Sequence, residues 1–494
     1  MRKHLLALTA FALSISASSQ VSRLGDDIEY KAELSGQFGD GDYTPFWQSA
    51  NKYGLASTDN NSGYLRAGIQ RQTNADSLRK WRIGYGADLV LPFGYDSKFI
   101  VQQLFADFQY KAVRLSVGQK EHPLGMRNQE LSSGGMMLGT NARPVPQVRI
   151  GVPEYWIIPK TKDLVAIKGH CAYGWFADNK WQRKFNNGNN SAVYTANSLY
   201  HSKAGYLRVG NKDKFPIVFT GGLEMFCQFG GTVWNRGIDP NQADGSYKFK
   251  EGIKEYLQAF IPSGSDITDE EHPNIMGNSS GSYQARIDYY GKGWGAAVYG
   301  EHYFEDHSQF TWQYGWKDFL WGVELNLPKN PIVSTIVAEH ISTTDQSGPI
   351  LVAYGDKVPY ISGQDNYYNH NIYGAYQHAG FTMGNPLLLS PRYSSDGRIV
   401  CQDNRIKAIH LGIKGNPCDE LSYRILYTHE KSLGNFNIPH ENPKKGDFLL
   451  VEATYQPHQI KGLGITASYG MNHGDLLGKS NGGMLTISYS GWLK

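Results

Sequence analysis

Apolar and polar residues alternate along much of this chain with a period of two. In residues 28–38, IEYKAELSGQF, one set of alternate positions is mostly apolar, from Ile28 to Phe38, whereas the other carries Glu29, Lys31 and Glu33. The same alternation recurs in residues 81–92, 217–229, 283–289, 294–304, 319–327 and 449–455. It predicts β-strands that have one apolar face and one polar face.

These segments are about ten residues long and tend to end in aromatic residues, which is typical of the strands of transmembrane β-barrels. Strands of secreted β-sandwiches and propellers also alternate, but they are usually ~5 to 6 residues long. The core of a sandwich could not bury charged side chains such as those of Glu29, Arg286 and Asp288. We therefore predict an all-β fold, an antiparallel outer-membrane β-barrel.

The number and spacing of the segments predict the topology. Eighteen strands are expected, starting near residues 28, 64, 81, 99, 113, 147, 164, 203, 215, 282, 293, 317, 332, 399, 420, 447, 462 and 483. The inner turns, near residues 74–80, 111–112, 158–163, 211–214, 291–292, 328–331, 415–419 and 457–461, are short. The outer connections include residues 39–63, 120–146, 176–202, 230–281, 343–398 and 429–446. An even strand number returns both termini to one side, so we expect a single barrel domain over residues 20–494 with periplasmic termini, short periplasmic turns and long outer loops.

The first 19 residues have the features of a secretory signal peptide. Basic residues precede an apolar run over residues 5–15, and the small residues Ala17 and Ser19 suit cleavage before Gln20. The apolar run is shorter than the ~20 residues of a membrane-spanning helix. We predict export to the outer membrane after cleavage near Ser19/Gln20.

The net charge and the last segment indicate which partners to expect. The formal charge is +3, and removal of residues 1–19, which hold two cationic and no acidic residues, leaves +1. Nothing in this charge favours nucleic acid as a binding partner. The barrel itself implies contact with outer-membrane lipid. Residues 480–494, SNGGMLTISYSGWLK, resemble the final-strand signal that the outer-membrane insertion machinery reads, although Lys494 stands where an aromatic residue is usual.

The four cysteines do not predict a disulfide framework. Cys171 and Cys227 fall on the lipid-facing side of predicted strands, where packing accounts for them. Cys401 and Cys418 lie at the two ends of one predicted strand, much farther apart than the ~4.4 to 6.8 Å between Cα atoms that a disulfide requires. We therefore predict no obligatory disulfide.

Five segments are distinctive in their order along the chain. They are YKAELSGQFGDGDYTPFWQSANKYGL (30–55), GYLRAG (63–68), GTNARPVPQV (139–148), DNYYNHNIYGAYQHAGFTMGNPL (365–387) and IHLGIKGN (409–416). Together they resemble the Wzi-type capsule assembly family, in the form found in the Bacteroides group of Gram-negative bacteria. The resemblance implies an eighteen-stranded outer-membrane barrel that holds or organises capsular or surface polysaccharide as a carbohydrate-binding protein.

The first outer loop carries an apolar cluster within a polar sequence. In residues 39–55, Trp47 and Tyr53 are candidate polysaccharide-binding residues, because an aromatic face can cover the apolar face of a sugar ring. Alternatively, Phe46 and Trp47 are buried against lumen-facing side chains and narrow the mouth of the barrel. The two interpretations are compatible on different residues.

Two further outer connections supply polar candidates. Tyr367, Tyr368 and His370 could hydrogen-bond sugar hydroxyls, or they could hold their long loop in shape. Arg143 could pair with an anionic polysaccharide, or it could satisfy a carboxylate in the lumen.

The sequence lacks the known catalytic and metal-binding motifs. No serine occupies a nucleophile elbow, and no zinc spacing, phosphate-binding loop or dinucleotide fingerprint occurs. In residues 301–310, Glu301 and Glu305 share the lumen face of a predicted strand and His302 faces the other way, so the three cannot bind one ion unless the strand ends there, and a hydrated strand end accounts for the cluster. We predict a non-enzymatic protein without metal or cofactor.

A substrate-selective porin is the alternative function, and a barrel hydrolase is a third. Eighteen strands of about ten residues use only about 180 residues in the membrane. Most of the chain therefore lies in strand extensions, loops and turns, which favours an occluded barrel over a plain pore.

Overall fold

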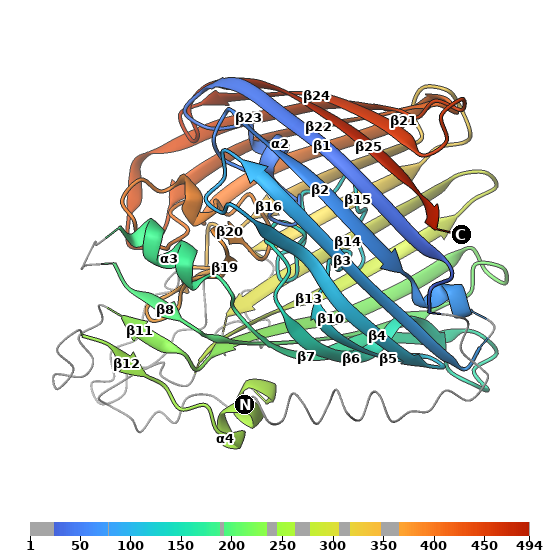
Figure 1. Cartoon of the computed structure of the whole chain (residues 1–494), viewed down its shortest axis with the longest axis horizontal. Helices are drawn as coiled ribbons and strands as arrows, with labels where there is room; N and C mark the ends of the chain where they lie inside the picture. The colour runs from blue at the N-terminus through green and yellow to red at the C-terminus, as the bar shows by residue number, and fades with distance from the viewer. Residues whose placement is uncertain are drawn as a thin grey trace.

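The computed structural model describes residues 24–77, 79–187, 192–234, 245–261, 277–305, 317–346 and 365–493 and shows a closed antiparallel barrel (Figure 1). Its eighteen strands pair in chain order, and β1 closes the barrel by pairing with β25. They are β1 (Ile28–Gly41), β2 (Ser62–Arg71), β3 (Trp81–Phe93), β4 (Ile100–Tyr110), β5 (Val113–Gln119), β6 (Gln147–Ile157), β7 (Val165–Trp175), β9 (Leu199–Val209), β10 (Ile217–Phe229), β13 (Asn278–Tyr290), β14 (Gly295–Glu305), β15 (Phe319–Asn326), β16 (Thr335–Ser342), β21 (Ile406–Cys418), β22 (Leu421–Gly434), β23 (Pro439–Tyr455), β24 (Leu463–Gly474) and β25 (Ser480–Leu493). The predicted fold class and strand number are confirmed, whereas the predicted signal peptide lies outside the described residues.

All but two of the predicted strand starts lie within four residues of the observed ones. β21 starts seven residues later than predicted, because the preceding residues belong to a loop inside the barrel, where the Thr343 hydroxyl donates to the carbonyl of Asn404 at 2.7 Å. β23 starts eight residues earlier than predicted, so the outer connection expected at 429–446 is wrong. β22 and β23 continue as a paired hairpin that turns at residues 435–438. The polar segment ENPKK (441–445) breaks the alternation although it is part of β23.

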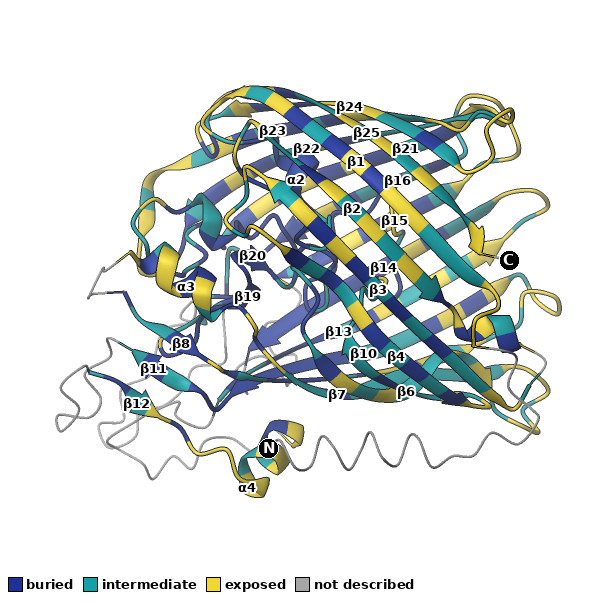
Figure 2. Ribbon diagram, viewed as in Figure 1, coloured by how far each residue is buried: buried dark blue, intermediate teal, exposed yellow. Residues whose placement is uncertain are grey.

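The two faces of the wall match the alternation in the sequence (Figure 2). On β1, Ser35 and Gln37 point inward and are 3% and 6% exposed, whereas Leu34 and Phe38 point outward and are 55% and 61% exposed. Outward-facing apolar side chains recur around the wall and form a belt that suits lipid. Among the described helices, none has the length and apolar character needed to span a bilayer.

The connections differ between the two ends of the barrel. At one end, here called the turn end, lie the C-terminus and short connections such as residues 111–112 and 419–420, together with a 3-10 helix, η1 (Thr73–Asp76). At the opposite end, the loop end, most connections are long and carry α3 (Asn179–Asn186) and a small sheet of β8 (Tyr194–Ala196), β11 (Thr232–Trp234) and β12 (Tyr247–Lys248). The predicted contrast between short turns and long loops is confirmed.

Three loops fold back from the loop end into the barrel and form what we call the lumen plug. They are residues 42–61, which contain α2 (Phe46–Ser49), residues 120–146, and residues 365–405, which contain β17 (Asn369–His370), β18 (Gly374–Ala375), β19 (Gln377–His378), β20 (Phe381–Thr382) and η2 (Pro391–Tyr393). Their side chains join wall residues in one buried apolar cluster, which includes Trp47, Met137, Tyr368, Leu388 and Phe448. The largest hydrophobic cluster among the described residues therefore lies inside the barrel.

A short amphipathic helix, α4 (Ile253–Phe260), lies against the outside of the wall (Figure 1). Ala259 packs with the outward-facing residues Cys227 and Phe229 of β10. Ile253 and Leu257, one turn apart, remain 82% and 60% exposed. The helix therefore extends the apolar belt of the wall near the loop end. The four cysteines are all free thiols.

The exposed face of α4 is expected to lie in the lipid headgroup and acyl boundary. A spin label at Leu257→Cys, in a chain with Cys171→Ser and Cys418→Ser, should collide more with oxygen than with a water-soluble nickel chelate. The same label at Lys254→Cys, on the polar face, should show the reverse preference. Equal accessibility to the nickel chelate at both positions would contradict a lipid-facing helix.

Candidate functional site

Trp47 lies in the plug and is 2% exposed. Its indole nitrogen donates to the Thr428 hydroxyl of β22 at 3.1 Å, and its ring centroid is 4.9 Å from that of His410 on β21. Phe46, next to it in α2, stacks on Phe448 of β23 at 4.7 Å. These contacts match the packing alternative for this pair, and a sugar ring could stack on Trp47 only after α2 had left the wall.

Tyr367 and Tyr368 are also fully buried in the plug. The Tyr367 hydroxyl donates to Asp318 at 3.1 Å, and the Tyr368 backbone amide donates to Glu305 of β14 at 2.7 Å. His370 is partly exposed, and its Nδ1 accepts the amide of Ile372 at 3.1 Å. Tyr367 and Tyr368 are thus tied to residues outside their own loop, His370 accepts an amide within it, and polysaccharide binding by these three residues stays a prediction.

Tyr53 and Arg143 are brought together by the fold, because both line one cavity in the lumen. The Tyr53 hydroxyl donates to the carbonyl of His122 at 3.1 Å, and burial raises the pKa of Tyr53 to about 12. Desolvation inside the lumen lowers the pKa of Arg143 to about 10, so its side chain is still a cation at neutral pH. No hydrogen-bond partner for Arg143 Nε occurs among the described residues.

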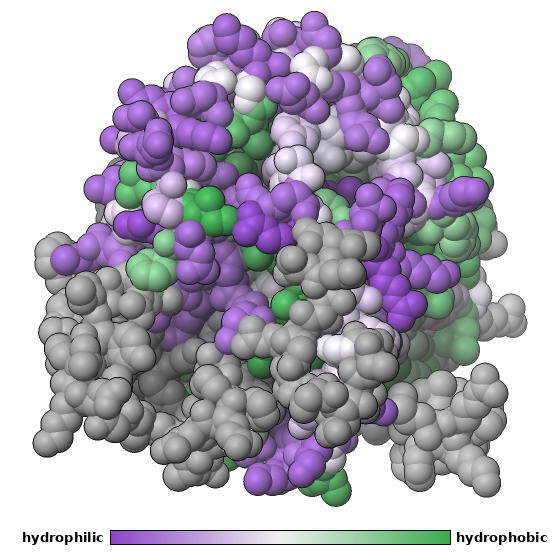
Figure 3. All heavy atoms as spheres, turned by 90° about the vertical axis from the view of Figure 1, so that its left-hand side faces the viewer, coloured by the Kyte–Doolittle hydropathy of each residue, from purple (hydrophilic) through white to green (hydrophobic). Residues whose placement is uncertain are grey.

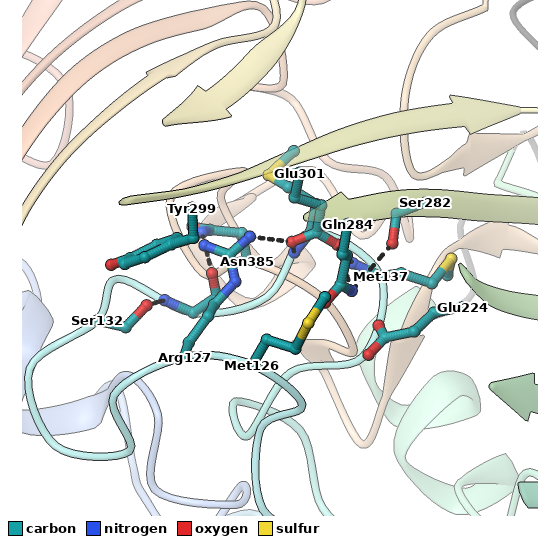
Figure 4. Close-up of polar contacts among 12 residues, drawn as sticks. Met126, Arg127, Ser132, Met137, Glu224, Ser282, Gln284, Tyr299, Glu301 and Asn385 are labelled. Atoms are coloured by element: carbon teal, nitrogen blue, oxygen red, sulfur yellow. Dashed lines mark hydrogen bonds and ion pairs between the residues drawn. The ribbon is translucent and has the colours of Figure 1, made fainter. Parts of the chain in front are cut away.

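A buried charged network fastens residues 120–146 to the wall (Figure 4). Arg127 donates to the carboxylate of Glu301 on β14, and both side chains are nearly inaccessible, at 4% and 0% exposure. The same carboxylate accepts the backbone amides of Met136 at 2.9 Å and Met137 at 3.2 Å. One wall residue thus holds both a side chain and two backbone amides of the plug.

A second wall carboxylate repeats this arrangement. Glu339 of β16 accepts the Ser132 hydroxyl at 2.7 Å, the Ser133 amide at 2.8 Å and the Tyr299 hydroxyl at 2.7 Å. Close by, His410 Nε2 donates to the carbonyl of Leu131 at 2.8 Å. Gly412 allows this approach, since a Cβ there would lie 2.5 Å from the same carbonyl oxygen. The plug is therefore positioned by hydrogen bonds as well as by apolar packing.

The described part of the segment at residues 301–310, residues 301–305, contributes to this network. Glu301 and Glu305 face the lumen, where both accept plug hydrogen bonds. His302 is on the other face of β14, and its Nδ1 contacts the Asp318 carbonyl at 3.0 Å. Residues 306–316 lie outside the described residues. Within the described ranges, no three His, Cys, Asp or Glu side chains are grouped as metal ligands.

The cavity that Tyr53 and Arg143 share, here called the lumen cavity, has a volume of 230 Å³. The plug contributes Leu138, Arg143 and other residues to its lining, and strands β4, β5, β6, β7, β9 and β10 supply the rest. Cations from the wall include Arg149 of β6 and Lys168 of β7. The sequence analysis did not single out these two residues, although both lie on the polar face of predicted strands.

A larger space, the turn-end vestibule, adjoins the lumen cavity and has a volume of 730 Å³. The linings of the two spaces share Lys120, Glu121 and Glu154, among others. The vestibule also contacts Asn74 and Arg82, which lie at the turn end. The lumen cavity therefore lies next to a space that extends toward the turn end.

The described residues of the loop end form a mostly hydrophilic face, and hydrophobic residues lie mainly toward the side wall of the barrel (Figure 3). Ion pairs cross this face, where Asp96 accepts Lys184 at 2.9 Å and Arg392 at 2.8 Å. A polar, charged surface of this kind suits contacts with hydroxyl-rich or charged ligands.

Comparisons with known proteins address the fold. No protein-family model matches the chain, and no curated protein matches it in sequence. Among solved structures it is similar to Wzi, an outer membrane protein involved in group 1 capsule assembly in Escherichia coli and described as a carbohydrate-binding β-barrel. The identity is 13%, 98% of this chain and 87% of that chain are covered, and the TM-score is 0.56. The outer membrane protein OprD from Pseudomonas aeruginosa is similar at 10% identity, with 97% of this chain and 96% of that chain covered and a TM-score of 0.46. The likeness to Wzi establishes the outer-membrane barrel fold.

Proposed function

We propose that this protein is a non-enzymatic outer-membrane barrel that binds or organises capsular or surface polysaccharide at the cell surface. The observation that carries the proposal is the lumen plug, because three loops fill the barrel and wall carboxylates hold one of them in place. An eighteen-stranded wall could enclose a water-filled channel, and in this chain the packed side chains of the plug occupy part of that space. The fold similarity to a carbohydrate-binding barrel of capsule assembly supports the same class of function.

The proposal includes an orientation in the membrane. Long loops of outer-membrane barrels face the outside of the cell and short turns face the periplasm. The hydrophilic loop end would then meet the polysaccharide, and both termini would be periplasmic after removal of residues 1–19. The outward-facing Leu485, Ile487 and Tyr489 of β25 fit recognition by the insertion machinery.

Deletion of the gene in the host tests the function. We expect cell-bound polysaccharide to fall severalfold and polysaccharide in the medium to rise, with the total unchanged, because attachment is lost while synthesis continues. Expression of the wild-type chain from a plasmid should restore the cell-bound fraction. Unchanged cell-bound polysaccharide in the deletion strain would refute the proposal.

A substrate-selective porin is the second candidate, and the turn-end vestibule is the observation that favours it. A space of 730 Å³ with a polar and charged lining is large enough to admit small solutes. The plug separates this space from the loop end in the described part of the chain, so we rank the porin below polysaccharide binding. Conductance measurements distinguish the two functions, as described below.

A further inference from the structure

The lumen cavity has cations that the protein itself leaves unpaired. Arg143, Arg149 and Lys168 line it, and none of the three makes an ion pair within the described residues. Lys120 differs, since it pairs with Asp107 at 2.5 Å. Cations that line a desolvated cavity without a carboxylate partner are suited to a charge-assisted hydrogen bond with an anionic ligand.

The carboxylates that line the cavity are mostly engaged elsewhere. Glu121 pairs with Arg66 at 3.3 Å, and Glu224 accepts the Tyr206 hydroxyl and the amide of Leu138. Glu154 is the acidic group closest in character to a competitor, because it interacts electrostatically with Lys168. Glu224 also interacts electrostatically with Arg149, but its oxygens already accept two hydrogen bonds and it makes no ion pair with Arg149 among the described residues. Arg143 and Arg149 therefore have no carboxylate of the protein within ion-pair distance in the described part of the chain.

An irregularity in the wall shapes this cavity. The pairing of β6 with β7 shifts between Val152 and Trp156, so that β6 has extra residues opposite β7. Pro153 and Glu154, within the shift, line the cavity. Bulges of this kind change the direction of side chains and are common beside functional sites.

The size and the remaining lining residues restrict the ligand. A volume of 230 Å³ is below the ~300 to 1,000 Å³ of pockets for drug-sized ligands, so the cavity itself suits a ligand of about one sugar unit. Tyr53, Tyr200 and Tyr206 bring aromatic rings into the lining. Aromatic rings with nearby cations are the combination that an acidic sugar needs, because its ring has apolar faces and its carboxylate carries charge.

We propose that the lumen cavity is a binding site for a carboxylated sugar, with Arg149 and Arg143 as the residues that recognise the carboxylate. The proposal goes beyond the proposed function, because this site adjoins the turn end and would take a periplasmic acidic saccharide, whereas the polysaccharide of the proposed function would meet the loop end. The ligand enters through the turn-end vestibule, which adjoins the cavity.

The test compares glucuronate with glucose, which has the same ring but no carboxylate. Binding of each to the purified protein in detergent is measured by ligand-observed NMR titration. We expect glucuronate to bind about tenfold more tightly than glucose, and Arg149→Gln to lose about tenfold in glucuronate affinity, as expected for a charge-assisted contact. The control is Arg424→Gln, a lumen arginine that lines neither the lumen cavity nor the vestibule and pairs with Glu452 at 2.6 Å.

Each other outcome overturns the proposal. Equal affinities for glucose and glucuronate would remove the role of the carboxylate. Inorganic phosphate that binds as tightly as glucuronate would make the cavity a general anion site. Unchanged affinity in an Arg149→Gln protein that keeps its heat-modifiable gel mobility would place the ligand elsewhere. Loss of attached polysaccharide on gene deletion, together with any of these results, would leave the proposed function intact and reject only this site.

Discussion

Removal of the plug segment between β5 and β6 is expected to convert a silent barrel into a conducting one. The wild-type protein should show no steady current in a planar bilayer, because plug side chains form a packed cluster inside the wall. A variant in which a short Gly/Ser linker replaces residues 124–142 loses the residues that bind Glu301 and Glu339. Its vestibule should then connect to the loop end, and stepwise channel openings should appear in single-channel recordings.

The matched control for this experiment replaces a loop-end connection outside the plug. Asn435 donates to the plug carbonyl of Cys401 at 3.3 Å and is kept, whereas Phe436 and Asn437, at the tip of the hairpin of β22 and β23, are exchanged for other turn residues. That variant should be as silent as the wild type. A large steady conductance of the wild-type protein would show an open lumen and would put the porin ahead of the polysaccharide-binding function.

Substitution of Glu301 by alanine is expected to release the plug without unfolding the wall. Arg127 would keep its buried position but lose its main carboxylate partner, and breaking a buried ion pair from one side costs about 3 to 5 kcal/mol. The amides of Met136 and Met137 would lose their acceptor as well. Hydrogen exchange at these two amides should therefore accelerate strongly, while strand amides in β1 and β25 stay protected.

The charge and the hydrogen bonds of Glu301 can be separated. Glu301→Gln keeps one oxygen acceptor for the backbone amides but not the negative charge, so its exchange rates should fall between those of the wild type and Glu301→Ala. Glu29→Ala removes a carboxylate of β1 that accepts Gln70 and makes no contact with the plug among the described residues, and it should leave these rates unchanged. Slow exchange at Met136 and Met137 in Glu301→Ala would show that apolar packing alone retains the plug.

The wall was predictable from the sequence because each strand is amphipathic by itself. A strand such as β1 must expose Leu34 and Phe38 to lipid and turn Ser35 and Gln37 inward, so its period is visible without knowledge of its neighbours. The alternation of apolar and polar residues is lost where strands extend beyond the membrane. Residues 441–445 have no lipid-facing requirement, so their pairing within β23 leaves no periodic signal.

The conformation of the plug was only partly predictable, because it depends on contacts with wall residues that are far away in the sequence. The sequence left open whether Trp47 packs or binds sugar, and the contacts that bury it come from Thr428 and His410. In the sequence alone, Tyr367 and Tyr368 likewise resemble exposed loop residues, because their carboxylate partners, Asp318 and Glu305, lie far from them in the chain. Arg149 and Lys168 were missed for the opposite reason, since lumen-facing charges are ordinary in a barrel and only the shape of the cavity separates these two from the others.

The anchoring of the plug has a consequence for biogenesis. Arg127 and Glu301 are 174 residues apart in the chain, and Ser132 and Glu339 are 207 residues apart. Contacts of such long range form late, because the loop they close must be ordered first. The segment between β5 and β6 therefore has no docking surface until β14 and β16 have joined the sheet. A nascent barrel should pass through an intermediate whose wall is assembled and whose interior is still wet, and docking of the plug would be the final step of maturation.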